Sequence, residues 1–267
     1  KTAQPIALAK AGHLMWMERA SQGAFKICRT VAELRDGLAR GVVSGILHME
    51  GAEAIDPDLD ALHVFHAMGL RSLGPVWSRP TVFGHGVPFA FPSGPDTGPG
   101  LTEAGKRLVA ECDRLGVLVD LAHLNEAGFW DVAQISTKPL VSTHSAAHAL
   151  CPATRNLTDR QLDAMAETGG LVGLNFGVAF LRADGMKNPD TAAEVMIRHL
   201  DHLMAHLGED GVALGSDFDG TMIPGWMGSA AGLPGLVAAM QRAGYGAALI
   251  EKLCWGNWMG VLRRIIG

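Results

Sequence analysis

The chain has 267 residues, of which 48% are hydrophobic and 18% are charged. This composition provides enough apolar surface for a large buried core and excludes a wholly disordered protein. The formal net charge is −5 and no block of lysine and arginine occurs, so nucleic acid and anionic membranes find no attractive surface. We therefore expect a soluble globular protein with neither a nucleic-acid nor a membrane partner.

The cysteines point to a reducing compartment. All four are far apart in the sequence and form no C-x-x-C pair: Cys28, Cys112, Cys151 and Cys254. Neither a zinc finger nor a disulfide framework is supported by this spacing. We expect reduced thiols and a cytoplasmic location.

Six short apolar runs, most of which end in a polar or aromatic residue, recur in the chain. They cover residues 42–50, 70–77, 117–123, 140–144, 171–176 and 212–217. Runs of this kind are typical of buried parallel strands. Helical patterns fill most of the intervals, at residues 58–68, 102–112, 194–207 and 234–254, the last one broken near 244–246, with a capping-box pattern at 158–161.

One interval is different, because residues 78–100 are rich in proline and glycine and too long for a simple connection. Long irregular segments of this kind are often active-site loops or lids. We expect this segment to cover a functional site.

Alternating strands and helices indicate an α/β protein, either an open doubly wound sheet or a (β/α)8 barrel. No glycine-rich phosphate loop follows any of the runs, which disfavours a nucleotide-binding open sheet. Barrel enzymes carry their chemistry at the carboxyl ends of the strands, and Glu50, His123, His144 and Asp217 occupy such ends. The sequence therefore predicts one barrel domain over residues 1–267, with six of its eight strands recognisable.

Two histidines and two carboxylates at four strand ends are a suitable ligand set for a catalytic zinc ion, which takes nitrogen and oxygen ligands and keeps one position for water. A single histidine at a strand end is more often an ordinary loop residue. Four such residues together favour a metal site, although their spacing does not prove that they converge.

Five short motifs in order carry a resemblance to a known family. They are Met49-Glu50-Gly51, Val119-Asp120-Leu121-Ala122-His123, Ser142-Thr143-His144-Ser145, Arg155-Asn156 and Gly215-Ser216-Asp217-Phe218-Asp219-Gly220. The chain resembles a bacterial-type member of the renal (membrane) dipeptidase family of zinc metallopeptidases, in the amidohydrolase superfamily. The resemblance extends from about residue 40 to Trp258.

The resemblance implies a zinc-dependent dipeptidase with two zinc ions in a (β/α)8 barrel. Glu50 would bridge the two ions, and His123 and His144 would ligate one of them. Asp217 would act as acid and base beside a metal-bridging hydroxide, and Arg155 would grip the free carboxylate of the dipeptide. The expected partner is a small peptide substrate. Relatives often accept a D-residue at its carboxyl-terminal position.

The chain departs from the family pattern at its first strand, where a His-x-Asp pair would bind the other zinc ion. His199-Leu200-Asp201 matches the letters but lies in a predicted helix, where residues two apart do not share a face. We therefore expect the missing strands, roughly two of the eight, to precede Lys1. On the same helix, His202 and His206 are four residues apart and could chelate a metal, but an ordinary exposed helix face is the favoured interpretation.

A second departure is Trp77, which stands where many relatives carry a histidine that contacts the scissile carbonyl. An indole donates one hydrogen bond and does not titrate, so Trp77 is expected to line the substrate pocket. His85, within residues 78–100, is a candidate replacement for the missing histidine.

Alternatives remain at this point. Arg155 taken alone would be read as a surface arginine in an ion pair. The same scaffold could instead hydrolyse lactams or N-acyl amino acids, or it could be a non-catalytic barrel that binds peptides. A homodimer is a possible assembly.

Overall fold

The computed structural model describes residues 3–267. Its strands are β1 (Phe25–Ile27), β2 (Val43–Gly45), β3 (Leu47–Glu50), β4 (Leu70–Gly74), β5 (Leu118–Val119), β6 (Val141–Ser145), β7 (Leu171–Leu174) and β8 (Val212–Leu214). Its α-helices are α1 (Ala3–Ala20), α2 (Val31–Ala39), α3 (Asp60–Met68), α4 (Glu103–Leu115), α5 (Glu126–Ile135), α6 (Asp159–Glu167), α7 (Val178–Leu181), α8 (Ala193–Leu207), α9 (Leu233–Arg242), α10 (Ala247–Glu251) and α11 (Asn257–Ile266), with a 3₁₀ turn at Ala230–Gly232 and a π-helical turn at Lys252–Gly256.

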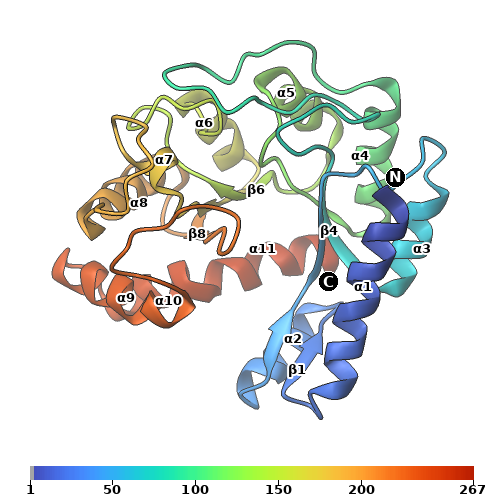
Figure 1. Ribbon diagram of the computed structural model, residues 1–267, viewed down its shortest axis with the longest axis horizontal. Helices are drawn as coiled ribbons and strands as arrows, with labels where there is room; N and C mark the ends of the chain where they lie inside the picture. Colours follow the sequence, from blue (N-terminus) through green and yellow to red (C-terminus); the bar gives the residue numbers. More distant parts are fainter. Residues whose placement is uncertain (1–2) are drawn as a thin grey trace.

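Six parallel strands follow one another in chain order. β3, β4 and β5 form one sheet and β6, β7 and β8 another, and a parallel bridge between Asp120 and Val141 connects the two. Each of the six runs predicted from the sequence contributes one of these strands. Helices α3 to α6 and α8 lie on the outside of the strands (Figure 1), as the strand–helix alternation requires.

The predicted strand over residues 42–50 is in fact two strands. β2 pairs with β1, whereas β3 pairs with β4, so the chain changes partner at Ile46. The elements α1, β1 and α2, which precede residue 40, carry no motif and were not predicted. The strands expected before Lys1 lie outside the described residues.

Capping residues set the helix starts as the sequence indicated. Thr102 accepts a hydrogen bond from the Gly105 N–H at the start of α4. At α6 both hydrogen bonds of the capping box between Thr158 and Gln161 are present. The predicted break near residues 244–246 separates α9 from α10.

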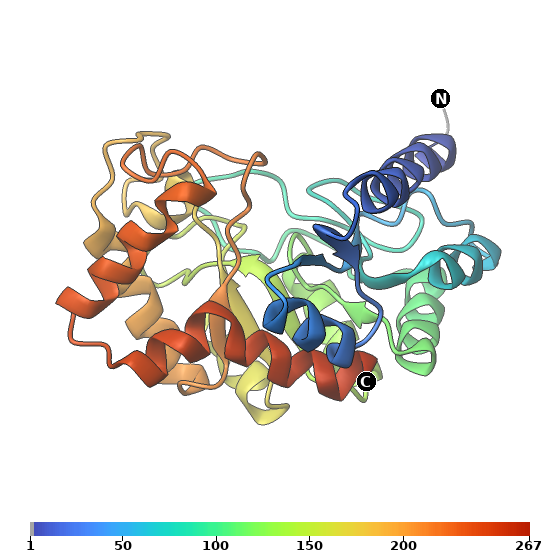
Figure 2. The same cartoon turned by 90° about the horizontal axis from the view of Figure 1, so that it is seen from below.

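Helix α11 runs from β8 to α2 along one end of the molecule (Figure 2). Trp258 Nε1 donates to Leu214 O at 2.9 Å, and the last residue, Gly267, accepts from Val31 N at 2.8 Å. Between α11 and the strands lies a cavity of about 380 Å³, lined by Ile46, His48, Glu50, Ser72, Leu118, Thr143, His144, Trp258 and Leu262. The space between α11 and the strands is therefore lined mainly by apolar surface, with a few polar groups that include Glu50 and His144.

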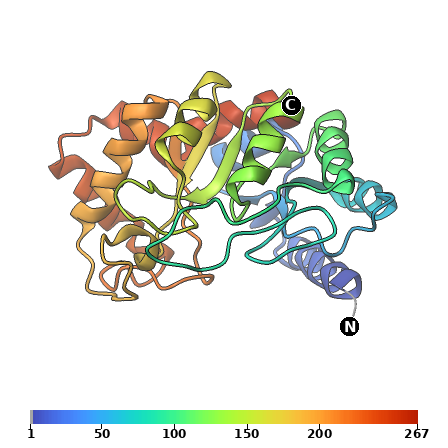
Figure 3. The same ribbon diagram turned by 90° about the horizontal axis from the view of Figure 1, so that it is seen from above.

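Residues 78–100 form neither helix nor strand, as predicted. The segment (teal) passes over the strands in Figure 3, and Val87 N donates to His123 O at 2.8 Å. It thereby covers the carboxyl end of β5. Within residues 3–267, every helix is too short or too polar to cross a membrane.

Candidate metal centre

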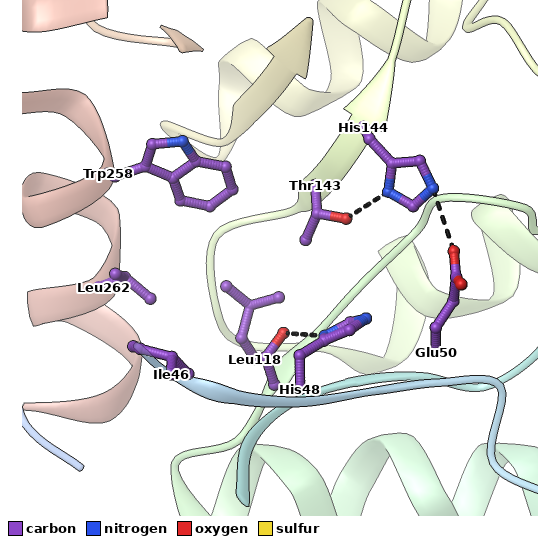
Figure 4. A pocket seen from close by; sticks show the side chains of 9 residues that line it. Ile46, His48, Glu50, Leu118, Thr143, His144, Trp258 and Leu262 are labelled. Atoms are coloured by element: carbon purple, nitrogen blue, oxygen red, sulfur yellow. Dashed lines mark hydrogen bonds and ion pairs between the residues drawn. The ribbon is translucent and has the colours of Figure 1, made fainter. Parts of the chain in front are cut away.

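Three predicted side chains meet at one point. Glu50 is the last residue of β3, His123 follows β5 and His144 lies in β6. Glu50 Oε1 is 3.0 Å from His123 Nε2 and 3.2 Å from His144 Nε2, and the two Nε2 atoms are 3.1 Å apart. Figure 4 shows the Glu50 carboxylate and the His144 ring pointing toward each other. Two nitrogens and one oxygen therefore converge.

A chain of hydrogen bonds fixes the proton on His144. The Thr143 hydroxyl lies 2.6 Å from Asp120 Oδ2 and 2.7 Å from His144 Nδ1. A hydroxyl has one proton, which it donates to the carboxylate, so it accepts from Nδ1–H of the imidazole. His144 Nε2 is then left with its lone pair facing Glu50, the state that a metal ligand requires.

His123 is supported in a similar way by the residue after Trp77. Ser78 Oγ lies 2.8 Å from His123 Nδ1, and the ring is 5% exposed. Burial and, to a lesser extent, the nearby positive charge of Arg155 lower the pKa of His123 to about 4, against the opposing effect of Glu50. The buried imidazole is thus neutral near pH 7 and available as a ligand.

The donor set fits a divalent metal ion. Two imidazole nitrogens and a carboxylate oxygen are preferred ligands of zinc, and hydroxyl groups hold the distal nitrogens of both rings. A glutamate carboxyl group is ionised near pH 7, so Glu50 brings a negative charge to the two ring nitrogens. Two lone pairs and a negative charge crowded together are stabilised by a cation at their centre.

The backbone at two predicted site residues is unusual. His123 has φ of 69° and Asp217 has φ of 57°, in the left-handed region that costs a non-glycine residue roughly 1 kcal/mol. Such conformations cluster at functional sites, where they aim a side chain that a relaxed backbone would not. Both residues stand just beyond the end of a strand.

Arg155 is a buried residue, so its interpretation as a surface arginine in an ion pair is wrong. The side chain is 4% exposed, and Nη2 donates to His144 O at 3.0 Å. The guanidinium lies over the Phe180 ring, 5.7 Å from its centroid. Among the described residues Nε has no hydrogen-bond partner. Burial lowers the pKa of Arg155 to about 10, and the charges of Asp217, Asp120 and Glu50 oppose this effect, so the group stays positive.

Asp217 lies beside the metal cluster rather than within it. Its Oδ2 accepts a hydrogen bond from Asn175 Nδ2 at 3.0 Å, and its charge is the largest attraction acting on Arg155. The three ligand atoms that lie within 4.8 Å of one another come from Glu50, His123 and His144. Asp217 is therefore not one of the three converging ligands, and Asn175 holds its carboxylate in place.

Aromatic side chains form a continuous row of contacts from His123 to Arg155. Trp77 packs on the His123 ring with centroids 5.5 Å apart and on Phe89 at 5.4 Å. Phe89 stacks on Phe180 at 6.1 Å, which in turn lies beneath Arg155. We call Trp77, Phe89 and Phe180 the aromatic wall. Phe89 is 57% exposed, so the wall has an open side.

The other histidines near the site have separate partners. His85 Nδ1 lies 3.1 Å from Gly100 O, within its own loop. His48 Nδ1 bonds Ser72 Oγ at 2.8 Å in the cavity beside Glu50 (Figure 4). His199 of α8 is buried, whereas Asp201 is exposed, so this His-x-Asp sequence does not present one face, as the sequence indicated.

Several residues of the site were not predicted. Ser78, Thr143 and Asp120 support the ligands, and Phe89 and Phe180 complete the aromatic wall. Thr143 and Asp120 stand in the two histidine motifs and could have been noticed there. Ser78 and Phe89 reach the site because residues 78–100 pass over it, and Phe180 reaches it from α7. Sequence spacing reveals neither path.

Known proteins share the fold and much of the sequence of this chain. A crystal structure of a metallo peptidase from Rhodobacter sphaeroides, liganded with a phosphinate mimic of the dipeptide L-Ala-D-Ala, is 64% identical to the chain with a TM-score of 0.98, and the match covers 98% of this chain and 75% of that one. This likeness confirms the barrel-type α/β fold.

Curated relatives match as well. A protein from the pqqA 5' region of Klebsiella pneumoniae is 46% identical over 245 residues, 92% of this chain and 90% of that protein. Dipeptidase tcpJ of Claviceps purpurea is 30% identical over 228 residues, 84% of this chain and 52% of the dipeptidase. The chain thus spans about half the length of that dipeptidase.

The family model described as membrane dipeptidase, peptidase family M19, matches residues 2–266. The resemblance therefore starts well before residue 40, where the sequence motifs placed its beginning, because α1, β1 and α2 belong to the shared fold. The chain is a member of the membrane dipeptidase family, peptidase family M19, a family of metallopeptidases.

Proposed function

We propose that the protein is a zinc-dependent dipeptidase that hydrolyses the amide bond of dipeptides with a free carboxyl-terminal carboxylate. The observation that carries the proposal is the convergence of Glu50, His123 and His144 beside the buried cation Arg155. A metal ion in the cluster would polarise the scissile carbonyl and lower the pKa of a bound water.

The side chains of this chain have distinct tasks in the reaction. Glu50, His123 and His144 would hold the metal, and Glu50 would be the ligand shared with a second ion. Asp217 takes the proton from the attacking water and returns it to the nitrogen of the departing amine. One water is consumed, a C–O bond forms at the carbonyl carbon, and the C–N bond breaks.

Recognition of the dipeptide follows from the groups around the cluster. Arg155 offers N–H donors in a planar fork, which suits a carboxylate, and its burial strengthens that interaction. The aromatic wall would contact the side chains of the substrate. Acceptance of a carboxyl-terminal D-residue is supported by the bound L-Ala-D-Ala mimic in the Rhodobacter sphaeroides relative.

Asp217→Asn tests the proton-transfer step. The amide cannot accept a proton, so turnover should fall by about a hundredfold or more, whereas bound zinc should match the wild-type protein because Asp217 is outside the ligand cluster. Turnover and zinc content are measured on the same preparation. Activity close to wild type in this variant would remove Asp217 from the mechanism.

Arg155→Ala tests the carboxylate contact. The KM for a dipeptide should rise by tenfold or more, since a charge-assisted hydrogen bond is lost, while the smaller hydrolysis of the matching dipeptide amide should change little. Steady-state kinetics on both substrates provide the comparison. An equal loss on the two substrates would contradict the assigned role.

The alternatives are separated by substrate. A panel containing dipeptides, N-acyl amino acids and a lactam distinguishes dipeptidase activity from other amidohydrolase reactions. A protein that binds dipeptides without hydrolysing any member of the panel would be the non-catalytic barrel. The cytoplasmic location is supported by the free state of all four cysteines in the described part of the chain; the homodimer stays a prediction.

A further inference from the structure

A second cluster of ligand-type side chains lies outside the catalytic centre. Asp159 is the first residue of α6, and His202 and His206 are one turn apart on α8, which packs against α6 (Figure 1). One ligand atom from each of the three residues lies within 4.8 Å of the other two. The sequence favoured an ordinary exposed helix face here, yet the two histidine side chains are only 22% and 23% exposed.

The distances suit a tetrahedral ion. Asp159 Oδ1 is 2.7 Å from His202 Nε2 and 3.6 Å from His206 Nε2. Ligands about 2.0 to 2.1 Å from a tetrahedral zinc ion are roughly 3.3 Å from one another. Side-chain movements of a few tenths of an ångström would bring the two distances from Asp159 Oδ1 close to this value.

A second carboxylate orients one of the rings. Asp163, one turn after Asp159 on α6, accepts a hydrogen bond from His206 Nδ1 at 2.7 Å. This contact leaves the Nε2 lone pair of His206 directed at Asp159. A carboxylate that holds the distal nitrogen of a histidine is the usual supporting group of a zinc ligand.

The charges also balance. The two carboxylates of Asp159 and Asp163 carry a charge of −2, which one divalent ion neutralises. The neighbouring cation on α6, Arg160, lies over the Trp130 ring at 4.5 Å and so does not take the place of such an ion.

We propose that Asp159, His202 and His206 bind a zinc ion, with Asp163 as a positioning residue and the fourth position facing solvent. The ion would fasten the start of α6 to α8. Because Arg155 precedes α6 by only a few residues, the site would also steady the segment that carries the proposed substrate contact. Its role is structural, and it is independent of the proposed dipeptidase reaction.

The test is zinc content and zinc affinity of folded protein. H202A/H206A should bind one zinc ion fewer per chain than the wild-type protein after dialysis against micromolar zinc. The rise in melting temperature on adding zinc should also shrink in this variant. The matched control is H63A, because His63 also lies beside a carboxylate, Glu111 at 3.4 Å, but belongs to no group of three converging ligand atoms in the described part of the chain; it should behave as wild type.

Asp163→Asn provides a milder change that keeps all three ligands. Losing the orienting carboxylate should weaken zinc at this site about tenfold to a hundredfold without removing it. Equal zinc content in wild type and H202A/H206A would overturn the proposal, as would equal loss in H63A. Dipeptide hydrolysis is assayed in parallel: its absence from all variants would count against the proposed function alone, since the difference in zinc content is a separate measurement.

Discussion

At the scale of single residues, the candidate metal centre depends on side chains outside the group of three converging ligands. The hydroxyl of Thr143 connects the buried carboxylate of Asp120 with the ring of His144. Burial raises the pKa of Asp120, but the neighbouring histidines and the hydrogen bonds from Thr143 outweigh burial and leave that pKa below its usual range. An ionised Asp120 therefore determines, through one hydroxyl, which nitrogen of His144 is free.

Thr143→Val should weaken metal binding about tenfold to a hundredfold, because the ring loses the partner that fixes its proton. The control is Thr143→Ser, which keeps the hydroxyl and should retain affinity near that of wild type. Competition with a coloured chelator measures the affinity of all three proteins. Wild-type affinity in the valine variant would show that the hydroxyl does not orient the ligand.

The sequence could indicate that residues at strand ends come together, but not that residues in loops join them. Glu50, His123 and His144 converge because parallel strands end at one edge of the sheet, and that can be inferred from the order of the apolar runs. The burial of Arg155 could not be inferred, since it results from Phe180 of α7 lying against the guanidinium, a contact that neither periodicity nor spacing encodes.

At the scale of elements, buried polar residues fasten helices to the strand ends. His199 of α8 accepts from Ala147 N at 3.2 Å, and its Nε2–H donates to Leu181 O of α7 at 2.9 Å. Burial lowers the pKa of His199 to about 4, so the folded protein holds this ring neutral. Capping residues and strand order were readable from the sequence, but this link was not, because its partners are 52 and 18 residues away.

The lowered pKa of His199 predicts loss of stability in acid. Between about pH 4 and the ordinary histidine pKa near 6.5, the unfolded chain binds a proton that the folded chain does not, so stability rises with pH in this window and falls as pH decreases through it. The His199→Asn variant lacks this titrating group, so only the wild-type protein loses its contribution in acid. On going from pH 7.5 to pH 4, the unfolding free energy of the wild type should therefore fall by roughly 3 kcal/mol more than that of the variant.

Urea unfolding of both proteins at the two pH values measures this gap. Other acid-sensitive groups affect wild type and variant alike and cancel in the difference. His199→Asn should be the less stable protein at pH 7.5, because two buried hydrogen bonds are lost. A gap that stays constant with pH would mean that His199 is not kept neutral by the fold.

At the scale of the whole molecule, six parallel strands place their polar ends on one side, and residues 78–100 cover them. The order of these strands was predictable, whereas the partner change at Ile46 was not, because it depends on pairing with β1, a three-residue strand without a distinctive pattern. That residues 1–267 form one barrel domain stays a prediction.

The central claim is that the cluster of Glu50, His123 and His144 holds a metal that this protein uses to hydrolyse dipeptides. The most direct measurement is release of free amino acid from L-Ala-D-Ala and L-Ala-L-Ala by zinc-loaded protein, by protein stripped with a chelator, and by stripped protein to which zinc is returned. We predict hydrolysis that disappears with the metal and returns with it. Hydrolysis that survives complete removal of metal, or none on any dipeptide by fully loaded protein, would contradict the account.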